Sequence, residues 1–171
     1  VETADIAALS SAHAEKLSTA AIASLSTDQM QAMTSTALNA LSSSQLNAIT
    51  ADDVAAMTTA QVSSLSSTQV ARLATEQVVA LTTDQIQALT SAQISVLTSL
   101  QINGMASDDL QALLTSQIRA LSTDQISNMS TDQISQLTTE QVAALSTAQT
   151  GALTSAQIES MSTAQMGALP F

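Results

Sequence analysis

An eight-residue unit repeats along this chain without insertion or deletion. Residues 81–88 (LTTDQIQA) represent it, and twenty-one copies fill residues 1–168 before a three-residue tail, 169–171. Position 1 is usually Leu or Met, positions 2 and 3 are Ser or Thr, position 5 is Gln, position 6 is Ile or Val, and position 8 is Ala. A fixed period of this kind is typical of repeat arrays, whose units are stabilised by their neighbours. We therefore interpret residues 1–171 as a single repeat domain without a linker.

The octad carries the signals of a helix N-terminus. If Thr82 is the N-cap, its hydroxyl can accept from the Gln85 N–H, and the Gln85 side chain can reach the Thr82 N–H, as in a capping box. Leu81 and Ile86 then occupy the two positions of a hydrophobic staple. Asp84 lies where a carboxylate meets the positive end of the helix dipole. The pattern predicts one helix of about six residues per octad, with a corner at each cap hydroxyl.

Other interpretations of an eight-residue period fit less well. In a continuous α-helix, eight residues overshoot two turns by about 80°, so the apolar stripe would wind around the helix. Coiled coils need periods of about seven or eleven residues. A β-solenoid would favour strict alternation and Gly, Asn or Asp at its corners, whereas this chain has three Gly in all. The predicted fold class is all-α, an α-solenoid or superhelix of short capped helices, with a β-solenoid as the alternative.

The same spacing predicts which positions form the interior. On a helical wheel, Ile86 and Leu89 lie within about 60° of each other, so positions 1 and 6 should face inward and positions 3, 4 and 7 should face water. Helices this short are not stable alone, so stability must come from stacking. Position 8 departs from Ala in adjacent pairs such as Ser64 and Arg72, and the pairs begin four octads apart. This spacing suggests about 32 residues per superhelical turn, or a square coil of four helices.

The first three octads are the least regular. Glu2 replaces the cap hydroxyl, and His13 and Ala21 replace Gln at position 5. End repeats of solenoids often depart from consensus because one face meets solvent. At the other end, Pro170 stands at a cap position, and we expect Phe171 to cover the end of the apolar interior.

The formal net charge of −11 arises from 14 acidic residues against three basic ones. Most of the acids stand at position 4 or 5, which is N2 or N3 of a predicted helix, so we interpret them as stabilising helix dipoles and keeping the chain soluble. Lys16, Arg72 and Arg119 are too few to form a phosphate-binding surface, so no nucleic-acid partner is expected. Ser, Thr and Gln interrupt every apolar run, so no membrane insertion is expected. The chain has no Cys and hence no disulfide, and no signal peptide begins at its first residue.

Few residues are candidates for chemistry. Asp52 with Asp53, and Asp108 with Asp109, place two carboxylates in one first turn and are weak candidates for a divalent cation. His13 has no second His or Cys to complete a metal site, and the Ser hydroxyls have no base to activate them. No Gly-rich phosphate loop is present. The sequence therefore predicts no enzyme, no catalytic residue and no cofactor.

Octads such as residues 121–128 (LSTDQISN) and 137–144 (LTTEQVAA) resemble the octapeptide arrays of large bacterial surface and secreted proteins. They are also similar to the repeat domain of the MtxA family of magnetotaxis-associated proteins in magnetotactic bacteria. The resemblance extends over the whole chain. It implies an α-helical repeat domain that is extracytoplasmic or associated with the cell envelope and linked to magnetotaxis signalling. It carries over no catalytic or binding residue.

Three functions follow as expectations. The first is a non-enzymatic scaffold that binds another protein through positions 3, 4 and 7 or through a superhelical groove. The second is an elongated spacer or adhesin-like stalk of a bacterial surface protein. The third is a weak binder of cations or a mineral surface through the acidic face.

Overall fold

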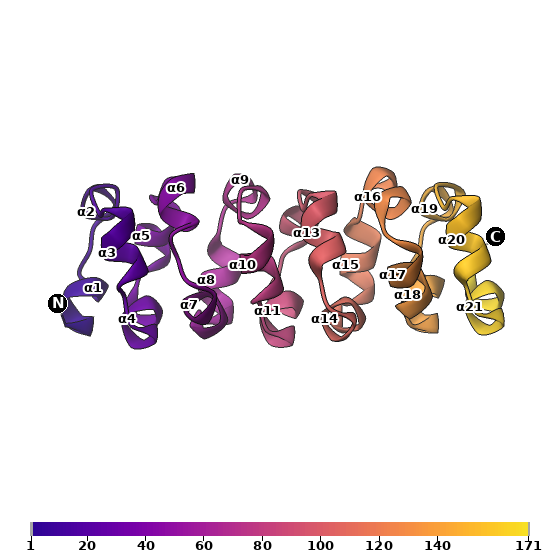
Figure 1. Cartoon of the computed structure of the whole chain (residues 1–171), viewed down its shortest axis with the longest axis horizontal. Helices are drawn as coiled ribbons and strands as arrows, with labels where there is room; N and C mark the ends of the chain where they lie inside the picture. The colour runs from indigo at the N-terminus through magenta and orange to yellow at the C-terminus, as the bar shows by residue number, and fades with distance from the viewer. Residues whose placement is uncertain (1, 171) are drawn as a thin grey trace.

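The computed structural model describes residues 2–170, and within that range it contains one short α-helix per octad and no strand (Figure 1). This confirms the all-α solenoid and excludes the β-solenoid. The helices are α1 (Thr3–Ala7), α2 (Ser11–Ala14), α3 (Thr19–Ala23), α4 (Thr27–Ala32), α5 (Ser35–Asn39), α6 (Ser43–Leu46), α7 (Ala51–Ala56), α8 (Thr59–Ser64), α9 (Ser67–Ala71), α10 (Thr75–Val79), α11 (Thr83–Ala88), α12 (Ser91–Ser95), α13 (Ser99–Gly104), α14 (Ser107–Ala112), α15 (Thr115–Ala120), α16 (Thr123–Asn128), α17 (Thr131–Gln136), α18 (Thr139–Ala144), α19 (Thr147–Gly151), α20 (Ser155–Ser160) and α21 (Thr163–Ala168).

Each helix begins at the position that the octad predicts. In α11, Thr82 Oγ1 accepts from Gln85 N at 3.3 Å and Gln85 Oε1 accepts from Thr82 N at 2.8 Å, which completes the predicted capping box. The helix ends at Ala88 and is followed by Leu89, the C-cap, whose backbone is extended at φ −61° and ψ 132°. No described residue has a positive φ. The corner between octads therefore uses ordinary backbone, which explains why an array with so few glycines turns so often.

The interior is built from positions 1 and 6, as predicted. Ile86 is fully buried and Leu89 is 5% exposed, and the same two positions supply most of a continuous apolar core from Ile6 to Leu169. Asp84 and Gln87, at positions 4 and 7, are exposed. None of the helices within residues 2–170 has the length and hydropathy needed to cross a bilayer. Phe171, the expected cover over the core, lies outside the described residues.

The predicted turn of four octads is wrong. Most helices pack against the helix three octads further on, as α1 does against α4 and α18 against α21. Hydrogen bonds between successive turns join residues 25 to 31 apart, as from Gln31 to Ala56 and from Gln85 to Val54. A turn therefore takes between three and four octads. A square coil would enclose more space than one layer of aliphatic side chains fills, and protein interiors are close-packed.

Successive turns are joined by the glutamines at position 5. Gln85 is 2% exposed, and its Nε2 donates to Val54 O at 2.8 Å and to Met57 O at 2.7 Å, 31 and 28 residues earlier. One side chain therefore caps its own helix and satisfies two carbonyls of the turn before it. We call the repeated arrangement the glutamine ladder. Gln133 makes the first of the two bonds, and both recur at Gln45, Gln61, Gln69, Gln77, Gln93, Gln101, Gln117, Gln125, Gln141, Gln149, Gln157 and Gln165.

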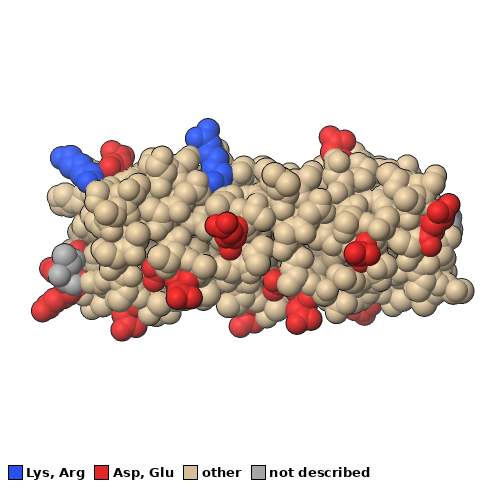
Figure 2. Space-filling view, viewed as in Figure 1, with Lys and Arg blue, Asp and Glu red and all other residues tan. Residues whose placement is uncertain are grey.

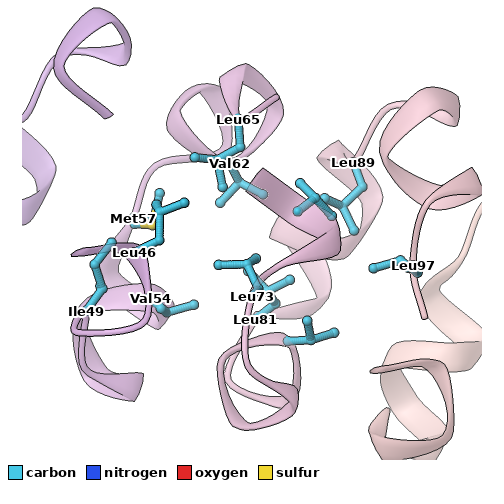
Figure 3. A pocket seen from close by; sticks show the side chains of 12 residues that line it. Leu46, Ile49, Val54, Met57, Val62, Leu65, Leu73, Leu81, Leu89 and Leu97 are labelled. Atoms are coloured by element: carbon cyan, nitrogen blue, oxygen red, sulfur yellow. The ribbon is translucent and has the colours of Figure 1, made fainter. Parts of the chain in front are cut away.

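A small apolar cavity lies in the interior beside octads with valine at position 6. Its volume is about 20 Å³, and Val54, Val62, Val70 and Val78 all line it (Figure 3). Most later octads of the central region carry isoleucine at this position, which is one methylene larger. The cavity has no polar lining and is roughly large enough for one water molecule, so we expect it to be dry.

Candidate functional site

The structure separates the two predicted aspartate pairs along the rod. Asp52 and Asp53 lie in the first turn of α7, and Asp108 and Asp109 lie in the first turn of α14. Asp52 and Asp108 are exposed, whereas Asp53 is 3% exposed and Asp109 is 9% exposed. Within residues 2–170, no group of three or more His, Cys, Asp or Glu side chains is placed to hold a metal ion. Binding of a divalent cation by these pairs stays a prediction.

Asp53 replaces a ladder glutamine. Its Oδ2 accepts from Thr50 Oγ1 at 2.8 Å, and Thr50 Oγ1 accepts from Asp53 N at 3.2 Å, so the helix is still capped. An ionised carboxylate has no N–H to donate. The carbonyls 31 and 28 residues earlier, at Ile22 and Leu25, therefore do not receive the amide that the ladder supplies elsewhere.

Asp109 interrupts the ladder more severely. The N-cap of α14 is Ala106, which has no hydroxyl, and the Asp109 carboxyl forms no hydrogen bond within the described residues. Burial raises the pKa of this carboxyl above its usual value, and the neighbouring Asp108 carboxylate raises it further. The site is a nearly buried acid without a partner.

His13 is held in a local contact. Its Nδ1 lies 3.0 Å from Ser10 Oγ, and the same hydroxyl caps α2 by accepting from His13 N. The ring is exposed. This geometry gives His13 a local role beside a helix cap, and the residue is not part of a larger constellation within residues 2–170.

One edge of the rod consists of helices that stack on one another. Packing joins α1 to α4, α4 to α7, α11 to α14, and α18 to α21. The ladder bonds from Gln85 to Val54 and from Gln141 to Leu110 link α7 to α11 and α14 to α18. In Figure 1 these helices follow the lower edge of the molecule. They therefore form one continuous surface from one end of the rod to the other.

Most of the acidic residues gather on this edge. Figure 2 shows acidic side chains spread along the lower edge and two basic side chains on the upper edge. No Lys, Arg or His belongs to the seven edge helices. We call the exposed acids of these helices and their N-caps the acidic edge; they are Glu2, Asp5, Asp28, Asp52, Asp84, Asp108 and Glu140.

Sequence reasoning missed this edge, although the signal is present. Asp28, Asp52, Asp84, Asp108 and Glu140 are separated by 24, 32, 24 and 32 residues. The mean, 28 residues, equals the register of the ladder bond from Gln85 to Met57. Each acid by itself is explained by its place at a helix N-terminus, and only the length of a turn shows that these acids share one side of the rod.

Open hollows lie at the two ends of the rod. The hollow near the N-terminus, about 370 Å³, is lined by residues that include Leu9, Leu17 and Leu25. The hollow near the C-terminus, about 480 Å³, is lined by residues that include Leu153 and Ile158. Both continue the apolar interior. Neither brings together polar groups that would perform chemistry.

Comparison with known proteins identifies one family. A family model described as the ALTTAQ repeat matches residues 1–35, 30–59, 48–83, 102–139 and 136–170. The matched ranges overlap in tandem and together cover well over half of the chain. No curated protein and no solved structure matches the chain.

Proposed function

Because this chain belongs to the ALTTAQ repeat family, we propose that it is a non-enzymatic scaffold that binds another protein through its outer surface. The observation that supports this proposal is that some positions of the octad build the fold and others face solvent. In most octads, positions 1, 2, 5 and 6 keep the same residue types, which form the core, the caps and the ladder. Apart from Asp53 and Asp109, every charged side chain within residues 2–170 is exposed. The charged side chains that differ from octad to octad therefore lie mainly on the outer surface, where a partner protein would contact them.

A spacer or adhesin-like stalk is the second candidate, and the rod shape with its continuous core favours it. The two candidates differ in what an internal deletion does. A stalk depends on length alone. A scaffold depends on which faces remain aligned.

Two deletions separate the candidates. Removing residues 57–112 takes out seven octads, which is twice the 28-residue register and keeps the flanking parts in phase. Removing residues 57–80 takes out three octads and rotates one flank against the other. Partners captured by the intact chain from envelope and soluble fractions would be purified, and their affinities for both deletions measured. A scaffold predicts that the shorter deletion is at least as harmful. A stalk predicts no captured partner, and an effect on attachment length that grows with the number of octads removed.

We further propose, on the resemblance to the MtxA family, that the chain acts in an extracytoplasmic or envelope-associated compartment and contributes to magnetotaxis signalling. Fractionation of a magnetotactic host that produces the tagged chain would test the compartment. Swimming reversals in an applied magnetic field would test the signalling role in a strain that lacks the gene. Recovery in the cytosol alone, together with normal reversals, would contradict this proposal.

A further inference from the structure

The position of the acidic edge is not explained by helix stabilisation. Position 4 is acidic in α4, α7, α11, α14 and α18, which all lie on this edge. In the fourteen helices off the edge, it is acidic at Glu76, Asp124 and Asp132 alone. A helix dipole attracts a carboxylate at every N-terminus, whichever side of the rod the helix faces. Stabilisation alone would therefore spread the acids around the rod.

The edge is also not neutralised by the chain itself. Lys16 follows α2 and Arg72 is the C-cap of α9, and both helices lie on the opposite side of the rod (Figures 1 and 2). Arg119, in α15, donates through Nε to Ala144 O at 3.0 Å. A row of one sign without internal counter-charge creates a negative potential along the rod.

Asp109 gives an independent indication that a cation belongs at this edge. Asp109 is 9% exposed, its carboxyl forms no hydrogen bond within the described residues, and it adjoins the exposed Asp108. A glutamine at this position would satisfy the ladder, as it does in the next octad at Gln117. The edge therefore keeps an unpaired acid where the fold would accept a neutral, bonded side chain.

We propose that the acidic edge binds a Lys- or Arg-rich segment of a partner protein that lies along the axis of the rod. This inference rests on the proposed scaffold function and names the surface and the class of partner. Nucleic acid and anionic membranes are repelled by the same charge, and a second copy of the chain presents the same sign. A row that runs over several turns also exceeds what a single small cation would use.

The spacing of the row suggests the form of the segment. Packed helices are separated by about 8–10 Å, so successive acids of the edge lie about that far apart along the axis. An extended chain advances about 3.3 Å per residue. A segment with Lys or Arg at about every third residue would therefore place one cation beside each acid.

The test uses the intact chain and a fluorescent peptide of fifteen residues that repeats Lys-Ser-Thr. Anisotropy at low salt would measure its affinity for the wild type and two variants. The edge variant carries D28N, D52N, D84N, D108N and E140Q. The matched control carries E15Q, E76Q, D124N, D132N and E159Q, which removes the same charge away from the edge. Circular dichroism would confirm that both variants are helical.

We expect the edge variant to bind the peptide at least tenfold more weakly than the wild type, and the control less than threefold more weakly. Added salt should weaken the wild-type complex, because exposed charges are screened. Equal losses in both variants would overturn the proposal, because net charge alone would then explain binding. It would also be overturned if the wild type bound calcium in calorimetry but did not bind the peptide.

Failure of this inference and failure of the scaffold function give different results. If the edge variant retains a captured partner with wild-type affinity, the acidic edge is not the docking surface and the scaffold function stands. If the intact chain captures no partner and the deletions affect length alone, the scaffold function itself fails.

Discussion

The first five octads and the rest of the chain form the same short helices with different residues at position 5. In the first region that position holds Asp5, His13, Ala21, Gln29 and Ala37. From Gln45 onward it is Gln in every octad except at Asp53 and Asp109. Helices form in both regions. Ser18 Oγ, for example, accepts from Ala21 N at 3.0 Å and caps α3 without any glutamine.

The comparison separates two roles that a ladder glutamine combines. A hydroxyl at position 2 is sufficient to begin a helix, because Ser10, Ser18 and Thr34 cap helices that have no glutamine at position 5. What glutamine adds is the bond to the previous turn, which Ala37 cannot make to Ile6 O and Leu9 O; Ala21 lies in the first turn and has no residue 28 or 31 positions earlier. Leu9, Leu17 and Leu25, which line the open N-terminal end of the rod, are only partly buried, whereas Met33 in the fifth octad and Leu89 and Leu97 in the other region are buried. Capping therefore sets the helices, and the ladder and core set the stacking of turns.

The largest effect is expected when a ladder donor is removed but its cap acceptor is kept. Gln117→Glu preserves an oxygen for Leu114 N but cannot donate to Ile86 O and Leu89 O, and it places a carboxylate beside both carbonyls. We expect a loss of about 3 kcal/mol in unfolding free energy, measured by urea denaturation at pH 7. Gln87→Glu, at an exposed position, is the control and should change stability by less than about 0.5 kcal/mol. Similar losses in both variants would show that the ladder bonds do not stabilise the fold.

A smaller gain is expected when the interrupted ladder is completed. Asp109→Gln places a neutral amide where Val78 O and Leu81 O lack the ladder donor and removes a nearly buried acid. We expect a gain of about 1–2 kcal/mol in unfolding free energy at pH 7. The exposed neighbour provides the control, because Asp108→Asn should change stability much less. A loss of stability in Asp109→Gln would mean that the surroundings of octad 14 no longer accept the ladder side chain.

The same variant gives a pH test. Because the folded protein raises the pKa of Asp109, it binds this proton more tightly than the unfolded chain does. The contribution to stability is therefore complete below the unfolded pKa, about 3.9, and is lost as pH rises through the folded pKa. The gain from Asp109→Gln should shrink as pH falls through this window. A gain that is constant from neutral to acidic pH would contradict the assigned cause.

The smallest effect concerns the valine and isoleucine parts of the core. Val70→Ile should fill part of the cavity of about 20 Å³ and stabilise the chain by up to about 1 kcal/mol. Ile118→Val, made in the well-filled part of the core, should destabilise it by about 0.5–1.5 kcal/mol. Melting temperatures of the two variants should therefore move in opposite directions. A drop in both would show that the cavity is too narrow to take the added methylene.

Much of the fold could be predicted from the octad, because caps and staples are local interactions. A helix N-terminus is indicated within four residues, by Thr82, Asp84 and Gln85. The inward and outward positions followed from the same spacing. The number of octads per turn did not, because it depends on how side chains from different octads fill the interior. The departures from Ala at position 8 therefore gave the wrong period.

The candidate site was less accessible from sequence. The sequence shows two aspartate pairs, Asp52 with Asp53 and Asp108 with Asp109. It does not show that the first member of each pair is exposed and the second is buried. The second role of Gln85 could not be inferred, since its acceptors lie 28 and 31 residues earlier. The alternating 24- and 32-residue spacing of the acids is present in the sequence. It indicates a shared side of the rod only when the length of a turn is given, and local signals do not give that length.

The central claim is that the buried glutamine amides join one turn of the solenoid to the next. Hydrogen exchange of glutamine side-chain amides, followed by NMR, tests it most directly, because the buried Nε2 groups of Gln85 and Gln93 donate to carbonyls of the previous turn, whereas the Gln87 side chain is exposed. The account predicts that the Nε2 protons of Gln85 and Gln93 exchange at least about a hundredfold more slowly than those of Gln87. Equal exchange rates for all three side chains would contradict it.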